Sequence, residues 1–585
     1  MPALHLPPAP GAATRRAIMS ARRKRWDVRP LAPAEFVQAT GLSPLLAGLL
    51  YQRDQRDPAT ITSFFAADMK TGLHDPLLMR GMPEASARIA QAVQSGEPMA
   101  VYGDFDTDGV TAVTLLVQAM TAMGGNIRPY IPHRTREGYG LNNDAIHQLA
   151  KEGVRLLITV DCGISNLVEV AEANSLGLDV IVTDHHHPPA ELPAAFAIVN
   201  PKQDGCAYPY KHLVGVGIAY KLVHALVKRG LSLGSVRGRD LLDVVALGTV
   251  ADMGPLTGEN RVLVKAGLDA IHSTTRPGLK ALIEVAGLTR SAISASDIGY
   301  TLAPRINAAG RLDDAVRAYQ LLLTDDDATA ERLARELNQT NRERQDLTKE
   351  VQAAAKAQAE AAGTQRGRIV VIAGEAFAAG VVGLVAGKLV EEWGRPVLLL
   401  EQGASESRGS ARSVPGFSII DALTGCKELF VRFGGHAAAA GFTIANANIP
   451  LLEAHLLAVA ERQLTDEMLQ PAITIDAPVK LDELGWDLLA ELKRLEPFGQ
   501  ANPQPTLMSA GVQVVDARPR GAEGQHLRLM LRDGGGVHEA IAFRLGHLAD
   551  ALHRHPRIDV AYTFDDDVWN GEHRLQLKVK DFRRA

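Results

Sequence analysis

Residues 99–109 read MAVYGDFDTDG, a short apolar run followed directly by a turn that carries three aspartates. The apolar run has the character of a buried strand. Asp104, Asp106 and Asp108 occupy alternate positions after it, and the glycines around them permit a tight turn. An amphipathic pattern at residues 112–123 predicts a helix. A strand, an acidic loop and a helix in this order indicate one unit of an α/β fold.

The same alternation continues further along the chain. Short apolar runs at residues 156–160, 180–183 and 197–199 have the length of strands, and residues 142–151 have a helical pattern. Strands that alternate with helices in this way form parallel sheets. The sequence therefore predicts an α/β fold whose parallel, doubly wound sheet carries helices on both faces.

The character of the sequence changes several times, which is expected because 585 residues are too many for one core. Residues 1–95 form a mainly helical lead-in whose Pro-rich start is expected to be disordered, and residues 96–324 contain the first α/β pattern. Residues 325–363 lack Gly and Pro until their end and predict one long charged helix that separates two lobes. A second α/β pattern occupies residues 364–465, and period-two patterns occupy residues 466–585.

The last segment predicts a small β-barrel. Leu527, Leu529 and Leu531 alternate with Arg528, Met530 and Arg532, and a second run alternates in the same way: Leu575, Leu577 and Val579 against Arg574, Gln576, Lys578 and Lys580. Such alternation is typical of half-buried strands, and here the outer face is basic.

The overall composition is that of an ordinary globular protein, with 46% hydrophobic and 22% charged residues. Three cysteines without paired spacing argue against a disulfide framework and against a cysteine zinc site. A basic run at residues 22–25 has no apolar segment after it, so we expect no secretory signal and a cytoplasmic location. The net charge of −5 does not exclude a nucleic-acid partner, because bound cations can make an acidic site locally positive.

Further acidic residues and histidines follow the other predicted strands. Asp161 ends the strand at 156–160, and Asp184, His185, His186 and His187 follow the strand at 180–183. Open parallel sheets bind ligands at the carboxyl ends of their strands, so these side chains are expected to meet the three aspartates there. A further aspartate, Asp252, follows an apolar helical run.

This set of side chains predicts a site for divalent cations. Many carboxylates in one place repel one another unless cations compensate them. Oxygen ligands mixed with imidazole suit Mn²⁺ or Mg²⁺ better than zinc, because thiolates are missing. Two such ions that share a carboxylate are the usual arrangement for phosphoester hydrolysis.

Other interpretations exist for each part of this set. The aspartate loop alone could be a solvated acidic turn or an EF-hand-like calcium loop, but Leu115 stands where the EF-hand requires its glutamate. A lone histidine is more often a surface or core residue than a ligand, whereas three in a row after an aspartate favour a metal site.

These residues, in this order, resemble the DHH phosphoesterase family. The resemblance rests on the aspartate loop, on Asp161, on the Asp184-His185-His186 triplet and on Asp252. It implies that Asp106 and Asp108 each hold one metal, that Asp161 bridges both, that Asp104 completes the first site, and that His185 and Asp252 complete the second. Asp108, Asp161 and His186 would carry the catalysis, with His186 facing the substrate phosphate; His187 lies outside the family pattern.

Other segments resemble one branch of that family, the RecJ family, and the resemblance covers residue 26 to the C-terminus. They are residues 134–142 (RTREGYGLN), 300–311 (YTLAPRINAAGR), 380–386, 409–413, 433–436 and 495–503 (LEPFGQANP). The resemblance implies a DHH domain, a DHH-associated domain after the long helix, and a C-terminal oligonucleotide-binding (OB) barrel. One departure is Phe377-Ala378, where RecJ-like sequences commonly carry a Trp-His pair.

The resemblance also implies an activity. RecJ-family proteins are single-strand-specific 5′→3′ DNA exonucleases that release 5′-mononucleotides and act in recombination and repair, and the resemblance implies the same activity here. The residues implied to hold DNA phosphates are His186, Arg305, Asn307, Arg311, Ser410, Arg412 and His436. The implied partners are single-stranded DNA, a single-strand-binding protein, a RecQ-type helicase and mismatch-repair factors, and a monomer is expected.

Two alternatives remain at this point. Other DHH enzymes cleave short oligoribonucleotides, cyclic dinucleotides or pyrophosphate, but they usually lack a C-terminal OB barrel. A catalytically inactive DNA-binding scaffold would be expected to lose Asp161 or His185, and both are present.

Overall fold

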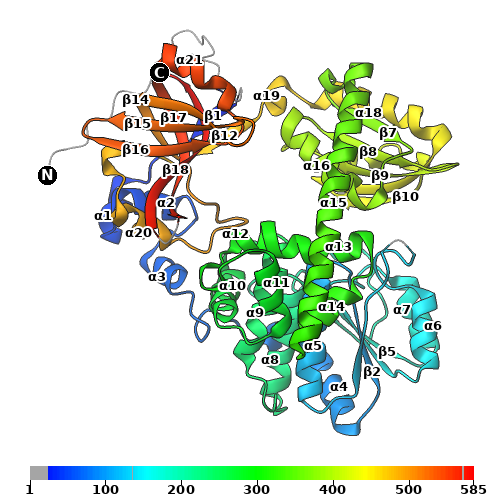
Figure 1. The fold of residues 1–585 in the computed structure, drawn as a ribbon. Helices are drawn as coiled ribbons and strands as arrows, with labels where there is room; N and C mark the ends of the chain where they lie inside the picture. The colour runs from blue at the N-terminus through cyan, green and yellow to red at the C-terminus, as the bar shows by residue number, and fades with distance from the viewer. Residues whose placement is uncertain (1–20, 22–23, 135, 570–571) are drawn as a thin grey trace. The chain divides into compact units, whose positions relative to one another are not determined.

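The computed structural model describes residue 21 and residues 24–134, 136–569 and 572–585; the Pro-rich start expected to be disordered lies outside these residues. The chain forms two compact units. One contains residues 57–465 together with 495–503, and the other contains the described residues up to 56 together with 466–494 and 504–585. Figure 1 shows the elements of both units.

The first sheet of the larger unit is parallel throughout, as predicted. Its order is β3-β2-β4-β5-β6. The strands are β2 (Met99–Gly103), β3 (Ile127–Tyr130), β4 (Leu156–Val160), β5 (Asp179–Thr183) and β6 (Ala197–Val199). Strand β3 is the one that the sequence pattern did not predict.

Helices cover both faces of this sheet, which confirms the doubly wound arrangement (Figure 1). On one face, Tyr102 and Leu157 pack with α6 (Asn143–Lys151) and α7 (Leu167–Ser175). On the other face, Val101 and Ile158 pack in the main core. The helices of that core include α4 (Met82–Ser95), α5 (Thr107–Ala122), α8 (Gly215–Lys228), α9 (Leu242–Ala251) and α10 (Gly258–His272). Neighbouring strand residues therefore face opposite layers, as the period of a strand requires.

The long charged helix is α15, which runs from Asp327 to Ala362. The side chain of Asp326 caps its start by accepting from the N–H of Thr329, and Gly363 ends it in the left-handed conformation with φ 68°. Its first half packs against α11 (Pro277–Val285) and α13 (Ala303–Leu312), and its second half packs against α16 (Ala379–Trp393). The helix thus connects the two lobes of this unit.

The second lobe has a mixed sheet with the order β10-β11-β9-β8-β7. The strands are β7 (Val370–Gly374), β8 (Val397–Gln402), β9 (Glu406–Arg412), β10 (Phe430–His436) and β11 (Ala439–Ala445). Only β7 and β8 pair in parallel within it. Phe377 is buried, and Ala378 stands at the N-cap of α16.

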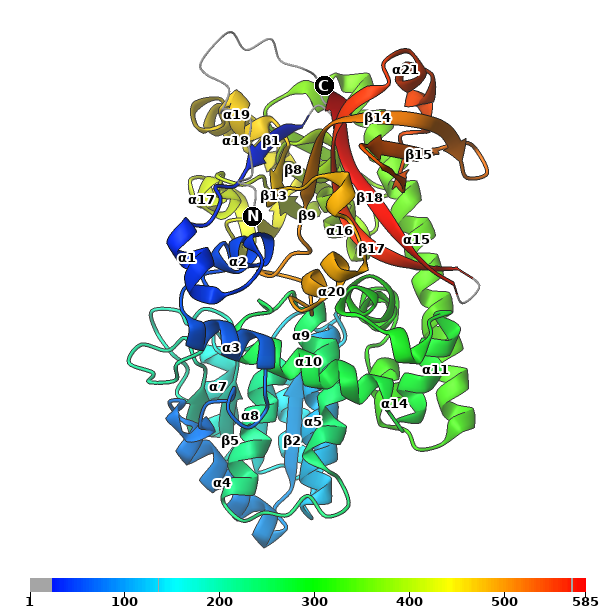
Figure 2. The same cartoon turned by 90° about the vertical axis from the view of Figure 1, so that its left-hand side faces the viewer.

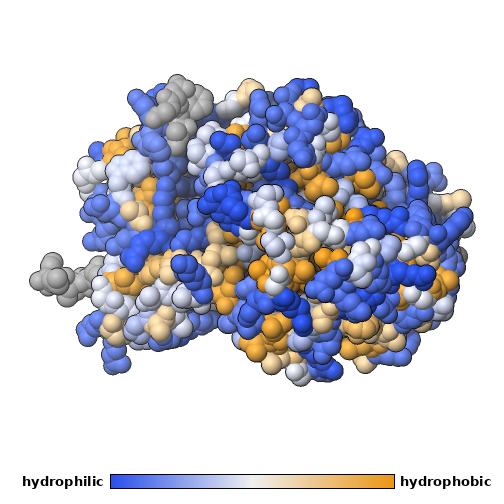
Figure 3. Space-filling model, turned by 90° about the horizontal axis from the view of Figure 1, so that it is seen from below, coloured by the Kyte–Doolittle hydropathy of each residue, from blue (hydrophilic) through white to orange (hydrophobic). Residues whose placement is uncertain are grey.

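Across the described residues, no helix has the length and apolar character needed to span a membrane. The face drawn in Figure 3 mixes hydrophilic side chains with smaller apolar patches.

The smaller unit contains the predicted barrel, which closes because β14 pairs with both β15 and β17. The strands are β14 (Leu507–Arg520), β15 (His526–Asp533), β16 (Gly536–Ala542), β17 (Arg557–Trp569) and β18 (Glu572–Arg584). Figure 1 labels all five, and Figure 2 shows β14, β15, β17 and β18 from another side. Leu527, Leu529 and Leu531 are completely buried, whereas Arg532 is exposed. The alternation read from the sequence therefore corresponds to the inside and outside of a barrel.

The N-terminal residues, which the sequence predicted as one helical segment up to residue 95, divide between the two compact units. Strand β1 (Arg25–Val28) pairs in parallel with β12 (Ala472–Ile475), and Ser43 donates a hydrogen bond to Glu491, so residues up to 56 belong with the C-terminal segments. Residues 57–95 pack with the larger unit instead. These pairings join residues more than 400 positions apart, so no local sequence pattern predicts them.

Candidate metal centre

The aspartate loop between β2 and α5 is held by hydrogen bonds from backbone N–H groups. Asp106 caps α5 by accepting from the N–H of Asp108 at 2.9 Å and of Gly109 at 3.1 Å. Asp108 accepts from the N–H groups of Gly215 and Val216, the first residues of α8, at 2.6 and 2.8 Å. Helix starts favour negative charge, so two helix termini fix the positions of these carboxylates.

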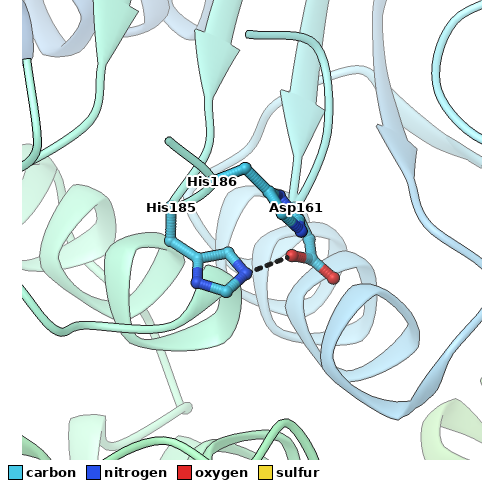
Figure 4. Close-up of side chains that lie close together, drawn as sticks. All are labelled: Asp161, His185 and His186. Atoms are coloured by element: carbon cyan, nitrogen blue, oxygen red, sulfur yellow. Dashed lines mark ion pairs between the residues drawn. The ribbon is translucent and has the colours of Figure 1, made fainter. Parts of the chain in front are cut away.

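Asp161 and His185 lie close together at the ends of β4 and β5. The imidazole of His185 points toward the Asp161 carboxylate, with 2.9 Å between Nε2 and Oδ1 (Figure 4). The same Nε2 lies 3.7 Å from Oδ2 of Asp252. Asp161 has φ 60°, a left-handed conformation that is costly for an aspartate and is found at functional sites.

The ligand atoms fall into groups of three. Asp104, Asp106 and Asp161 form one group, and Asp108, His185 and Asp252 form a second; within each group the ligand atoms lie within 4.8 Å of one another. Asp161 also groups with His185 and His186. The six residues predicted as metal ligands are thus brought together, in sets that have the composition of two neighbouring cation sites.

Several potential metal-ligand atoms of this cluster are buried without a hydrogen-bond partner. They are Oδ1 of Asp104, Oδ1 of Asp161 and Nε2 of His185. The 2.9 Å contact between the last two is short enough for an ion pair, but its geometry is not that of a hydrogen bond. Buried polar atoms normally have hydrogen-bond partners. A cation bound to the lone pairs of these oxygen and nitrogen atoms would take the place of the missing partners. The residues present therefore fit divalent cations.

The electrostatics of the cluster lead to the same conclusion. Burial, and then the charges of neighbouring carboxylates, raise the pKa of Asp108 to about 7 and that of Asp252 to about 9. The same causes raise the pKa of Asp104 and Asp161 well above the ordinary aspartate value. Burial lowers the pKa of His185 to about 3, so its imidazole is neutral and can act as a ligand. Cations would stabilise these carboxylates in their ionised form.

Asp184 has a different function within the triplet, because it orients the residues that follow it. Its carboxylate accepts from the N–H groups of Ile164, His185 and His186, and it lies 2.7 Å from Nδ1 of His186. Burial alone would raise the pKa of Asp184, but these bonds and the charge of His186 hold it below its ordinary value. Burial is the largest influence on the pKa of His186 and lowers it, but the bond to Asp184 and the charges of Asp184, Asp104 and Asp108 together outweigh burial, so the net pKa is raised. The sequence pattern alone predicted no separate role for Asp184, although its place in the triplet was a signal.

Arginines gather beside the cluster. The guanidinium of Arg134 lies 4.7 Å above the ring of Phe105. Burial lowers the pKa of Arg134, and the charges of Asp104 and Asp106 oppose this shift. Burial, followed by the charge of Arg134, lowers the pKa of Arg311 to about 10 and also lowers the pKa of Arg412. Among the described residues, none of these three arginines has a carboxylate within ion-pair distance. Guanidinium groups in such a setting have the charge and donor geometry that suit an anion.

The second lobe contributes Ser410 and Arg412 from β9. Nη1 of Arg412 donates to Oγ of Ser410 at 3.0 Å, and both lie against Gly383, where a Cβ atom would come within 2.9 Å of the Ser410 hydroxyl. His436 lies on β10, with its ring 6.2 Å from that of His187. Of these predicted residues, His436 lies near the end of the histidine run.

Two of the predicted phosphate-binding residues have other contacts. The guanidinium of Arg305 donates to Asn338 on α15 and to the carbonyl of Thr301, which lies in the π-helical turn Ile298–Leu302 just before α13. Asn307 accepts from the N–H of Thr107 at 2.9 Å and braces the aspartate loop. Arg134 belongs to the RecJ-like segment 134–142, but the sequence alone did not predict it as a phosphate-binding residue.

Family models match three parts of the chain. The DHH family N-terminal domain matches residues 98–249, the DHHA1 domain matches residues 366–466, and the RecJ OB domain matches residues 475–581. The fold and the cluster of carboxylates and histidines thus define a DHH-family protein.

Similarity to individual proteins extends over nearly the whole chain. The single-stranded-DNA-specific exonuclease RecJ of Bacillus subtilis is 37% identical, with 96% of this chain and 71% of the relative covered. RecJ of Escherichia coli is 34% identical, with 95% and 98% covered. The crystal structure of Thermus thermophilus RecJ in complex with Mn²⁺ is 32% identical, covers 96% of this chain and 80% of that chain, and has a TM-score of 0.82. The structure of that protein with Mg²⁺ has a TM-score of 0.76, at 31% identity and with 96% and 78% covered. The chain belongs to the RecJ family.

Proposed function

We propose that the protein is a single-strand-specific 5′→3′ DNA exonuclease that releases 5′-mononucleotides by hydrolysis with two divalent cations, Mn²⁺ or Mg²⁺. The observation that carries the proposal is the buried cluster of carboxylates and a neutral histidine with unsatisfied donor atoms, beside arginines from two lobes. Its relatives in the RecJ family are named as single-stranded-DNA-specific exonucleases, and one of them, from Thermus thermophilus, was solved both with Mn²⁺ and with Mg²⁺.

The six candidate ligands divide between the ions. Asp104 and Asp106 would hold one ion, and Asp108, His185 and Asp252 would hold the other. Asp161 would reach both, because its carboxylate groups with the acidic set and also contacts His185. When bound, the ions supply an activated water and neutralise charge on the scissile phosphate.

His186 and the arginines would orient the phosphate. Because Nδ1 of His186 is bound to Asp184, its other ring nitrogen is free to face the substrate, and the raised pKa favours a protonated ring that donates to a phosphate oxygen. Arg134, Arg311 and Arg412 would bind terminal and backbone phosphates, with Ser410 and His436 beside them. Hydrolysis then breaks the bond between phosphorus and the 3′-oxygen of the terminal nucleotide.

The other predicted DNA contacts need separate roles. We assign the phosphate contact to Arg311 in preference to Arg305, whose bonds go to Asn338 and Thr301. Asn307 would act through the backbone of the aspartate loop. The barrel, with basic residues such as Arg532 on its outer face, would bind the strand further from its end through phosphate contacts.

The cellular setting is part of the proposal. The protein would act as a monomer on single-stranded DNA in the cytoplasm, in recombination and repair. A single-strand-binding protein, a RecQ-type helicase and mismatch-repair factors would be its partners.

The test uses DNA labelled at its 3′ end, with Mn²⁺, and matched duplex and RNA controls. The proposal predicts progressive shortening of the single strand from its 5′ end, with release of mononucleotides, and no shortening by the Asp161→Ala variant or with chelator. If long DNA stayed intact while dinucleotides or pyrophosphate were cleaved, the cation site would stand and the substrate would be wrong.

A further inference from the structure

Residues 495–503, which we call the strap, belong to the larger unit although the chain on both sides of them belongs to the smaller one. The segment reads LEPFGQANP and lies inside the match to the OB-domain model at residues 475–581. Its contacts lie with α10 and with the loop after Asp252, both in the larger unit.

One end of the strap is anchored by Arg261 on α10. This side chain is 2% exposed, donates to the carbonyl groups of Leu495 at 2.9 Å and Glu496 at 2.6 Å, and also donates to the carbonyl of Phe64 at 3.0 Å. Its guanidinium lies 3.8 Å above the ring of Phe64. Hydrogen bonds from a buried charged group are strong, so this end of the strap is fixed to α10.

The strap is also braced internally. Gly499 and Asn502 exchange two backbone hydrogen bonds, at 2.9 and 3.1 Å. The side-chain amide of Asn502, which is 1% exposed, donates to the carbonyls of Leu495 and Pro497, both at 2.8 Å. These bonds close the segment into a tight turn with a defined shape.

The turn rests on the loop that follows Asp252. The N–H of Leu256 donates to the carbonyl of Gln500 at 2.7 Å. Gly499 faces the side chain of Leu256 so closely that a Cβ atom there would lie 2.6 Å from Cδ1. Leu256 is 1% exposed, so it has little room to move, and it lies four positions after Asp252.

We propose that the strap is a positioning element of the metal centre. By holding Leu256, it keeps the loop after α9 in place and so holds the carboxylate of Asp252 beside Asp108 and His185. Gly499, Gln500 and Asn502 act through that loop and contact neither cation nor substrate. This inference rests on the proposed function, because it assigns Asp252 to a cation. Groups that orient metal ligands typically change metal affinity about 10- to 100-fold when altered.

The test is calorimetric titration of the full-length protein with Mn²⁺, together with thermal unfolding of each variant. Asn502→Ala loosens the turn, and Gly499→Ala pushes on Leu256. Asp252→Asn is the reference for loss of the second cation. Ser509→Ala is the matched control, because Ser509 is a buried residue of the barrel whose hydroxyl bonds to Val479 and Tyr562.

The expected result is that both strap variants bind the first Mn²⁺ as the wild type does and bind the second about tenfold or more weakly. Ser509→Ala should lose thermal stability and keep both ions. The inference is overturned if the strap variants bind two ions with wild-type affinity while Asp252→Asn binds one. If the wild type bound no Mn²⁺, the proposed function would fail, and this inference with it.

Discussion

The backbone N–H of Gly215 donates to Oδ2 of Asp108 at 2.6 Å, which joins the first turn of α8 to the first turn of α5. Gly215 stands against the cluster so closely that a Cβ atom would lie 2.6 Å from Cβ of Asp161 and 2.9 Å from Oδ2 of Asp108. The position therefore requires glycine, and the metal centre is built against the backbone of a helix whose sequence carries no acidic residue in its first turn.

Gly215→Ala should weaken Mn²⁺ binding about 10- to 100-fold, because the added methyl displaces two candidate ligands. Gly217→Ala, two positions along the same helix, is the control; a Cβ there would come no nearer than 3.3 Å to the side chain of Leu213. Titration calorimetry measures both. Equal affinities for the two variants would contradict the assignment of Asp108 and Asp161 as ligands.

Asp161→Asn should make the cation-free protein more stable and abolish its stabilisation by Mn²⁺. The substitution removes one of several buried, mutually repelling carboxylates. The wild type should gain about 2.7 kcal/mol at a Mn²⁺ concentration 100-fold above the dissociation constant. Thermal unfolding with chelator and with Mn²⁺ gives both quantities, with Asp204→Asn on an exposed turn as control. A variant that Mn²⁺ stabilises as strongly as the wild type would refute the prediction.

Arg412→Ala should raise KM for single-stranded DNA about tenfold or more and change kcat less. A charge-assisted hydrogen bond to phosphate is worth about 1.5–3 kcal/mol, and loss of one phosphate contact also lowers the salt dependence of binding. Arg408→Ala, on an exposed position of the same strand, should leave KM unchanged. Steady-state kinetics at several salt concentrations measure both. A purely kcat effect would mean that Arg412 does not bind the ground-state substrate.

Lys221→Met should destabilise the fold by about 3–5 kcal/mol, because it leaves the carboxylate of Glu259 buried without the lysine ammonium that neutralises it. The two side chains are completely buried and lie 2.9 Å apart, and Tyr208 also donates to Glu259. Denaturant unfolding monitored by circular dichroism gives the change in free energy of unfolding. A change below about 1 kcal/mol would show that water reaches the pair.

Much of the fold and of the candidate site could be predicted from local patterns. Apolar runs and acidic turns lie within a few residues of each other, so the strands before Asp104, Asp161 and Asp184 were identifiable, and parallel topology alone implied that their ends meet. The alternation at Leu527, Leu529 and Leu531 predicted the barrel for the same reason.

The remaining features depend on contacts between distant residues. Arg261 bonds to residues more than 230 positions away, and Gly215 bonds to Asp108 across 107 positions. The pairing of β1 with β12 and the anchoring of the strap likewise leave no periodic signal in either segment. Sequence proximity is equally uninformative for Arg305, which lies near Arg311 in the chain but donates to Thr301, just before α13, and to Asn338 on α15.

The most direct test of the central claim is anomalous diffraction from crystals of the protein grown with Mn²⁺. The account predicts two neighbouring peaks, one among Asp104, Asp106 and Asp161 and the other among Asp108, His185 and Asp252, with Asp161 reaching both. A single peak remote from these residues, or density in which Asp161 contacts no ion, would contradict it.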